Sequence, residues 1–135
     1  MAAPYVVVVE DDQDLRRMME SILTKAGFEV ESTADADVAF ERCRERTPSL
    51  IITDLMMPGV DGASLIRRLQ RWFAENTPPV IIASASHSRF EVGKEHNAKV
   101  LPKPFRMADL LHLANTLISA EDPQSAESNQ HDESQ

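Results

Sequence analysis

The sequence predicts one α/β domain, built on a parallel β-sheet of five strands with helices on both faces. Strand-like apolar runs alternate five times with segments whose apolar residues recur at helical spacing, which favours a parallel sheet with right-handed crossovers. The runs are continuously apolar, as in Tyr5–Val9, so each strand is expected to be covered on both faces. A length of 135 residues suits one domain with one core.

The first half of the chain contains three predicted strands and two predicted helices. The strand Tyr5–Val9 ends in three acids, and residues 15–26 then carry apolar side chains at helical spacing. Residues 28–30 predict a short second strand, and residues 36–46 predict the second helix. The apolar run Leu50–Thr53 predicts the third strand.

The second half continues the alternation after a turn-rich loop that contains one proline and two glycines. Its elements are a helix over 65–73, a strand over 80–83, a short helix Arg89–His96, a strand over 99–101 and a helix over 107–118. Trp72 is predicted to lie in the core and His96 at the surface. Beyond residue 119 the chain is polar without periodicity, so we predict a domain over 4–119 and a disordered acidic tail or linker over 120–135.

Composition excludes several classes of protein. No apolar run approaches the ~20 residues of a membrane span, and no secretory signal is visible. The single cysteine, Cys43, excludes an internal disulfide framework, so we expect a cytoplasmic protein. The formal charge is −8, and five of the 22 acids lie in residues 121–135, where no Lys or Arg occurs. This balance gives no electrostatic reason to bind nucleic acid or an anionic membrane.

Polar residues stand at the carboxyl ends of four predicted strands. They are Glu10 and Asp11, then Asp54, Ser84 and Lys103. These ends share one edge of a parallel sheet, where such folds bind ligands. Three carboxylates in one crevice repel each other, and Mg²⁺ would relieve this better than zinc because neither a thiolate nor a histidine is positioned nearby. A lysine and a hydroxyl at the same place indicate a second, anionic guest such as a phosphoryl group.

Four segments, in this order, resemble the receiver domain of bacterial response regulators, including the chemotaxis regulators of two-component systems. They are Val9-Glu10-Asp11-Asp12, Asp54-Leu55-Met56-Met57-Pro58-Gly59-Val60-Asp61-Gly62, Ala83-Ser84-Ala85 and Pro102-Lys103-Pro104-Phe105. The resemblance covers about residues 4–119. It implies a flavodoxin-like (βα)5 fold with strand order 2-1-3-4-5.

The resemblance also implies a role for each polar residue. Asp54 is expected to be the phosphoacceptor, Glu10, Asp11, Asp54 and the Met56 backbone carbonyl to hold Mg²⁺, and Ser84 and Lys103 to contact the phosphoryl group. The expected donor is a histidine kinase or a histidine phosphotransfer protein, and the expected receiver of the signal is a downstream protein or a fused output domain. The resemblance thus implies a signalling protein that catalyses only its own phosphoryl transfer and autodephosphorylation. Asp12 is expected to cap the first helix.

Two departures from the family concern the output of the signal. The aromatic switch position of the family holds Val100 here, and the segment from Ser84 to Lys103 is roughly one helical turn shorter than usual. Both lie on the face formed by the fourth helix, fifth strand and fifth helix, the common partner and homodimer surface. Since a β-branched side chain is stiff, we predict that Val100 stays packed and that residues 85–97 respond to phosphorylation.

Two alternatives remain at this point. A small aspartate-based phosphatase also forms an aspartyl phosphate, but usually carries a second acid two positions after the nucleophile, where this chain has Met56. A degenerate receiver would act as a binding module without phosphate. The presence of all the acids together with Ser84 and Lys103 gives no support to that reading.

Overall fold

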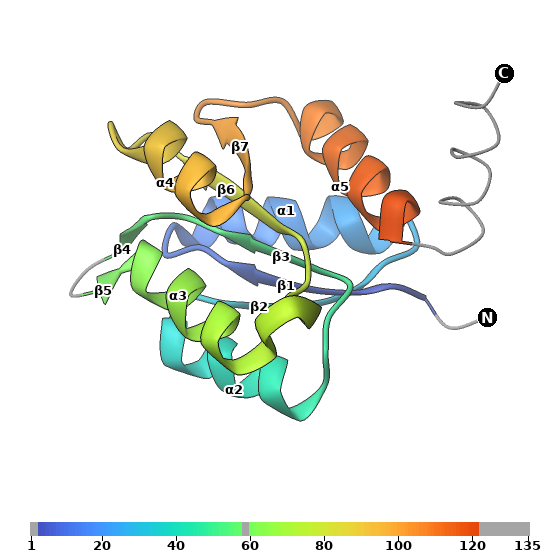
Figure 1. Cartoon of the computed structure of the whole chain (residues 1–135). Helices are drawn as coiled ribbons and strands as arrows, with labels where there is room; N and C mark the ends of the chain where they lie inside the picture. Colours follow the sequence, from blue (N-terminus) through green and yellow to red (C-terminus); the bar gives the residue numbers. More distant parts are fainter. Residues whose placement is uncertain (1–2, 58–59, 122–135) are drawn as a thin grey trace, which may run out of the picture.

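The computed structural model describes residues 3–57 and 60–121, and Figure 1 shows the arrangement of its elements. The parallel sheet contains β1 (Tyr5–Val9), β2 (Glu29–Thr33), β3 (Leu50–Thr53), β6 (Val80–Ser84) and β7 (Lys99–Pro102), in the order β2-β1-β3-β6-β7. The short strands β4 (Met56–Met57) and β5 (Val60–Asp61) pair with each other outside this sheet. Within the main sheet the order is therefore 2-1-3-4-5, and the predicted fold class is confirmed.

In the described part of the chain, α-helices cover both faces of the sheet (Figure 1). They are α1 (Gln13–Lys25), α2 (Ala36–Glu45), α3 (Gly62–Phe73), α4 (Arg89–His96) and α5 (Met107–Glu121), and the short 3-10 turn η1 (Ala74–Asn76) follows α3. The apolar residues of α1 and α5 pack against one face, and those of α2 and α3 against the other. In the described ranges no helix has the length and apolar character needed to cross a bilayer.

Strand β1 shows why its sequence is apolar at every position. Val6 and Val8 pack in the same cluster as Met19 of α1, whereas Val7 packs with Leu65 of α3 on the opposite face. Successive side chains of a strand point to opposite faces, so a central strand covered by helices on both sides buries all its side chains and is mostly apolar. Burial of each such side chain contributes about 1.5–3 kcal/mol.

Helix α1 begins and ends as its sequence predicts. The Asp12 carboxylate accepts a hydrogen bond of 3.1 Å from the Leu15 amide, which confirms Asp12 as the N-cap. The chain leaves the helix through Gly27, whose φ of 100° is a conformation that residues with a Cβ rarely adopt. At the start of the helix, only three residues join the end of β1 to α1, and the acids of this loop therefore lie at the edge of the sheet.

The second strand is longer than its apolar residues indicate. It spans Glu29–Thr33 rather than 28–30, and Phe28 instead packs in the core below α1. All five strand residues pair in register with β1. The polar residues of β2 are tolerated because it is an edge strand, and backbone pairing rather than apolar pattern sets its length.

Two side chains lie where the sequence did not predict them. Trp72 is 54% exposed, because its place on α3 is at the margin of the apolar stripe, one turn from Arg68. The side chain of His96 is only 8% exposed. His96 Nδ1 is 2.8 Å from Gln70 Oε1, while Gln70 Nε2 donates to the His96 carbonyl oxygen at 2.8 Å. This paired contact joins α3 to the end of α4.

Helix α4 is short, as predicted, and it packs very closely against β7. Asn97 ends the helix in a left-handed conformation with φ of 56°. Gly93 is buried one turn earlier, and a Cβ at this position would lie 2.5 Å from Val100 Cγ2 and 3.1 Å from the Ala98 carbonyl oxygen. Gly93 therefore lets the helix approach the strand at Val100.

Gly93→Ala is expected to lower the free energy of unfolding by about 1–3 kcal/mol, because the added methyl group overpacks the contact with Val100. In the Val100→Ala background the same change is expected to be neutral or stabilising, since alanine favours a helix over glycine by about 1 kcal/mol. Urea denaturation of the four proteins measures both effects. A stabilising effect of Gly93→Ala in the wild-type background would contradict the tight contact.

Candidate functional site

Strand pairing brings Glu10 and Asp54 side by side. Val9 of β1 pairs with Thr53 of β3, so the residues that follow them leave the sheet at the same level. The Asp54 amide donates to the Val9 carbonyl at 3.1 Å, which continues the ladder into the site. Both side chains are almost fully buried, with Glu10 1% and Asp54 4% exposed. Two buried carboxylates need a cationic partner, since an unpaired buried charge is very costly.

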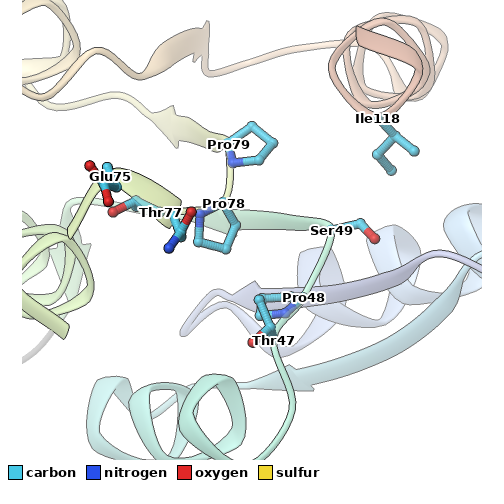
Figure 2. Close-up of a pocket in the computed structure, with 9 residues that line it drawn as sticks. Thr47, Pro48, Ser49, Glu75, Thr77, Pro78, Pro79 and Ile118 are labelled. Carbon is cyan, nitrogen blue, oxygen red and sulfur yellow. The ribbon is translucent and has the colours of Figure 1, made fainter. Parts of the chain in front are cut away.

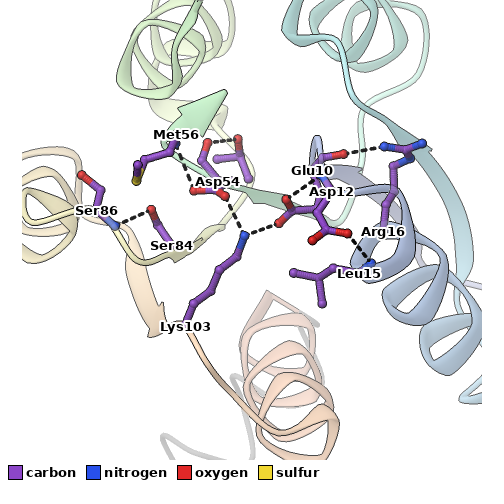
Figure 3. Close-up of polar contacts among 10 residues, drawn as sticks. Glu10, Asp12, Leu15, Arg16, Asp54, Met56, Ser84, Ser86 and Lys103 are labelled. Atoms are coloured by element: carbon purple, nitrogen blue, oxygen red, sulfur yellow. Dashed lines mark hydrogen bonds and ion pairs between the residues drawn. The ribbon is translucent and has the colours of Figure 1, made fainter. Parts of the chain in front are cut away.

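Lys103 supplies that cation from the other side of the sheet edge (Figure 3). Its Nζ atom lies 2.6 Å from Glu10 Oε1 and 2.7 Å from Asp54 Oδ2. The residue follows Pro102, which pairs with Ser84 at the end of β6, and the Lys103 amide donates to the Ser84 carbonyl at 3.0 Å. The peptide bond between Lys103 and Pro104 is cis. Glu10 precedes Lys103 by 93 positions and Asp54 precedes it by 49, and both contact the same ammonium group.

Asp11 completes a group of three carboxylates. One ligand oxygen from each of Glu10, Asp11 and Asp54 lies within 4.8 Å of the other two, and Asp11 is the exposed member. With all three ionised, their charge of −3 is reduced to −2 by Lys103. A hard divalent cation would neutralise the remainder, and carboxylate oxygens are the ligands that Mg²⁺ prefers. The bridging ammonium already shows that this position attracts positive charge.

The remaining predicted residues surround Asp54. The Met56 amide donates to Asp54 Oδ1 at 3.0 Å, and the Met56 side chain is exposed. Ser84 is completely buried, and its hydroxyl oxygen accepts a hydrogen bond of 3.1 Å from the Ser86 amide. Val100 lies farther away, half-buried and paired with Ile82 in the sheet. The site therefore contains an acidic centre, a cation and a buried hydroxyl, and Val100 is not part of it.

The hydrogen bonds of the site determine its protonation. Burial alone would raise the pKa of Asp54, but hydrogen bonds from Lys103, the Met56 amide and Ser84 outweigh it, so the pKa lies below its usual value. Burial raises the pKa of Glu10 despite the opposing contact with Lys103. Burial lowers the pKa of Lys103, yet its bonds to Asp54 and Glu10 leave a net increase. Asp54 is thus ionised at neutral pH, which is the form that can attack a phosphorus atom.

One residue of the site has no signal in the sequence. Arg16 of α1 donates from Nη1 to the Glu10 carbonyl oxygen at 2.8 Å, while the Asp12 amide donates to Glu10 Oε2 at 3.1 Å. The arginine therefore holds the acidic loop from the helix side (Figure 3). Arg16 is half-buried and is one of several arginines in the chain, and its local sequence does not distinguish it from the others.

A pocket of about 490 Å³ lies away from this site, where residues 47–49 and 77–79 lead into β3 and β6 (Figure 2). Three prolines, Pro48, Pro78 and Pro79, line it together with Ile118 of α5. These segments precede their strands, so the pocket is at the amino-terminal edge of the sheet. None of the predicted site residues lines it, and the acidic centre at the carboxyl-terminal edge is the better candidate.

Comparison of the sequence with known proteins supports the family resemblance that the four motifs indicated. The family model for the response regulator receiver domain matches residues 6–115. The chain is 33% identical to the response regulator receiver protein CpdR of Brucella abortus, over 85% of this chain and 97% of that protein. It is 34% identical to the transcriptional regulatory protein PrrA of Mycobacterium leprae, over 87% of this chain but only 51% of PrrA. The chain thus spans nearly all of one relative and about half of another.

The fold is also similar to solved structures. The chemotaxis protein CheY4 of Vibrio cholerae superimposes with a TM-score of 0.78 at 27% identity, covering 86% of this chain and 99% of that one. The sequence relatives and this solved structure therefore indicate the same kind of domain over most of the described chain.

Proposed function

The chain belongs to the response regulator receiver domain family, and from this premise we propose that it accepts a phosphoryl group on Asp54. The observation that carries the proposal is the buried Asp54 carboxylate, which shares the Lys103 ammonium with Glu10 and lies close to Asp11. Receiver domains are signalling modules of two-component systems. The proposed donor is a phosphohistidine on a histidine kinase or a histidine phosphotransfer protein.

The proposed transfer is an in-line displacement at phosphorus. An Asp54 carboxylate oxygen forms a bond to phosphorus while the bond between phosphorus and the histidine nitrogen breaks, and the imidazole keeps that electron pair. Little covalent assistance is needed in such a reaction, so the protein contributes positioning and charge neutralisation. Lys103 would place its ammonium beside the phosphoryl oxygens, and the Ser84 hydroxyl would donate to one of them. Attack by water on the acyl phosphate would restore Asp54.

We propose Glu10, Asp11, Asp54 and the Met56 backbone carbonyl as the residues that hold Mg²⁺. When bound, the ion would supply positive charge beside the transferring oxygens. Glu10 and Asp54 also accept hydrogen bonds from Lys103, so their ammonium partner and the divalent ion would share the same carboxylates. Binding of Mg²⁺ is therefore expected to perturb Lys103 as well as the acids.

Asp11→Asn is expected to weaken Mg²⁺ binding at least about tenfold, because it removes one of three charged ligands. The free energy of unfolding should change little, since the Asp11 side chain is exposed. Titration of the amide resonances of Glu10, Asp54 and Lys103 with MgCl₂ measures the affinity. Unchanged affinity in the variant would show that Asp11 is not a ligand.

Incubation with acetyl phosphate and Mg²⁺, followed by intact mass spectrometry, tests the proposed function directly. A receiver gains one phosphoryl group that persists long enough to be detected. A phosphatase would instead turn over the donor repeatedly, and a phosphate-independent binding module would gain nothing. The exposed, uncharged Met56 at the second position after Asp54 favours the receiver over the phosphatase.

We also propose that the signal leaves through the face of α4, β7 and α5, toward a downstream protein, a fused output domain or a second copy of the chain. Phe90 of α4 is a large exposed apolar side chain on this face. Helix α4 approaches β7 closely on this face, because a Cβ on Gly93 would lie 2.5 Å from Val100 Cγ2. A cytoplasmic location stays a prediction. The predicted tail over 120–135 is corrected at its start, because α5 extends through Glu121, and residues 122–135 lie outside the described ranges.

Phosphorylation is accordingly expected to shift amide resonances in residues 85–97 more than that of Val100. The reason is that Val100, a residue of β7, packs closely against Gly93 of α4, whereas the loop after Ser84 carries mostly exposed polar residues. Amide chemical shifts recorded with and without a phosphoryl mimic, such as beryllofluoride, measure this. Changes centred on Val100, with residues 85–97 silent, would contradict the prediction.

A further inference from the structure

An aromatic and cationic surface covers the outside of α2 and α3, away from the acidic site. We call it the α2–α3 aromatic surface and define it by Phe40, Arg44, Arg68, Arg71 and Trp72. The rings of Phe40 and Trp72 meet edge to face, with centroids 6.3 Å apart and an interplanar angle of 78°. An open pocket of about 230 Å³ lies between Phe40, Arg68, Arg71 and Trp72.

The arginines of this surface lie over the rings. The Arg44 guanidinium carbon is 5.1 Å from the Trp72 ring centroid, and that of Arg68 is 4.3 Å from the Phe40 centroid. Arg68 is held by an ion pair of 2.6 Å with Asp37, and Arg44 by one of 3.7 Å with Glu41. Such contacts order the aromatic and arginine side chains before a partner arrives, which lowers the entropy cost of binding.

The charge of α3 differs from that of the whole protein. The chain carries a formal charge of −8, yet the helix Gly62–Phe73 contains three arginines and no acidic residue. Within the described part of the chain, Arg71 makes no ion pair, although it lines the pocket beside Trp72. Tryptophan and arginine are also the residues that most often dominate the energy of protein interfaces.

From these observations we propose that the α2–α3 aromatic surface binds an acidic segment of a partner protein, with an apolar side chain of that segment packed against Trp72. Arg71 would pair with a carboxylate of the segment. A nucleic acid or an anionic membrane fits less well, because Asp37 and Glu41 lie at the edge of the surface and would repel a continuous row of phosphates. Residues 121–135 of this chain are acidic but contain no large apolar side chain.

Trp72 is the only tryptophan of the chain, so its fluorescence reports the surface directly. The probe is a synthetic peptide of about 12 alternating glutamates and serines with one central phenylalanine, matched by a version with alanine at the centre and one with lysines for glutamates. Saturable change of the Trp72 emission is expected only with the first peptide at concentrations up to about 1 mM. Raising the salt from about 0.1 M to about 0.5 M should weaken that binding.

Two charge-matched variants locate the site. Arg71→Glu is expected to weaken binding at least about tenfold, whereas Arg17→Glu, an exposed arginine on α1, should change it less than about twofold. Far-UV circular dichroism verifies that both variants fold. Asp54→Asn should bind the peptide with unchanged affinity, so failure of this proposal and failure of phosphoryl transfer are distinguishable.

Several results would overturn the proposal. One is a lack of response to the glutamate peptide, and another is an equal response to the lysine peptide. An emission change on dilution would identify a second copy as the occupant, and a change on truncation after Glu121 would identify residues 122–135. An equal shift with phosphatidylserine vesicles would assign the surface to a membrane. Equal effects of Arg71→Glu and Arg17→Glu would show that only net charge matters.

Discussion

Asp54→Asn is expected to abolish phosphoryl uptake from acetyl phosphate. The amide that replaces the carboxylate is a far weaker nucleophile, and it carries no charge to attract the bound cation. Both other carboxylates remain, but Glu10 accepts hydrogen bonds from Lys103 and the Asp12 amide, and its pKa is raised by burial. Intact mass spectrometry of the variant, after incubation with the donor and Mg²⁺, measures the effect.

A matched control, Asp12, directly follows the proposed metal ligands Glu10 and Asp11. Asp12→Asn also removes one carboxylate from the acidic loop, but asparagine caps a helix about as well as aspartate. The Asp12 side chain contacts the Leu15 amide rather than Asp54, so this variant should keep its phosphoryl uptake. Uptake by the Asp54→Asn protein at the wild-type level would assign the phosphoryl group to another residue.

Lys103→Met is expected to lower the free energy of unfolding by about 3 kcal/mol in the absence of divalent cations. The substitution leaves Glu10 and Asp54 buried, adjacent and without their shared cation. Both carboxyl groups then have a folded pKa above the unfolded value. As the pH rises through these raised pKa values, the buried carboxyl groups must ionise, which destabilises the folded state. The destabilisation should therefore be larger at pH 8 than at pH 5.

Mg²⁺ should restore much of this stability, because it binds the folded carboxylates in place of the ammonium. The variant should also bind the ion more tightly than the wild type does, since Lys103 no longer competes for the same oxygens. Urea denaturation with and without MgCl₂ measures both effects. Lys99→Met, which removes an exposed lysine at the start of β7, is the matched control. Equal stability of the two variants, or no response to Mg²⁺, would contradict the proposed competition.

Much of the fold was predictable because it depends on patterns within single elements. Continuous apolar runs predicted the buried strands β1, β3 and β6. The predicted short helix α4 is also present, and Asn97 ends it in a left-handed conformation. The exposed Trp72 and the buried His96 were predicted wrongly. Helical spacing gives the centre of an apolar stripe but not its margins, where neighbouring elements decide exposure. His96 is buried through Gln70, a residue 26 positions earlier that no local pattern connects to it.

The sequence by itself determined which residues can form the candidate site, because polar side chains after buried parallel strands must lie at one edge of the sheet. It did not determine how they are paired. The position of Lys103 Nζ between Glu10 and Asp54 follows from the register of four neighbouring strands and the path of the chain after β7. The support of Glu10 by Arg16 and the stacking of arginines on Phe40 and Trp72 likewise depend on how separate elements pack. Such contacts were decided by the tertiary structure alone, since their energies depend on distances between residues far apart in the chain.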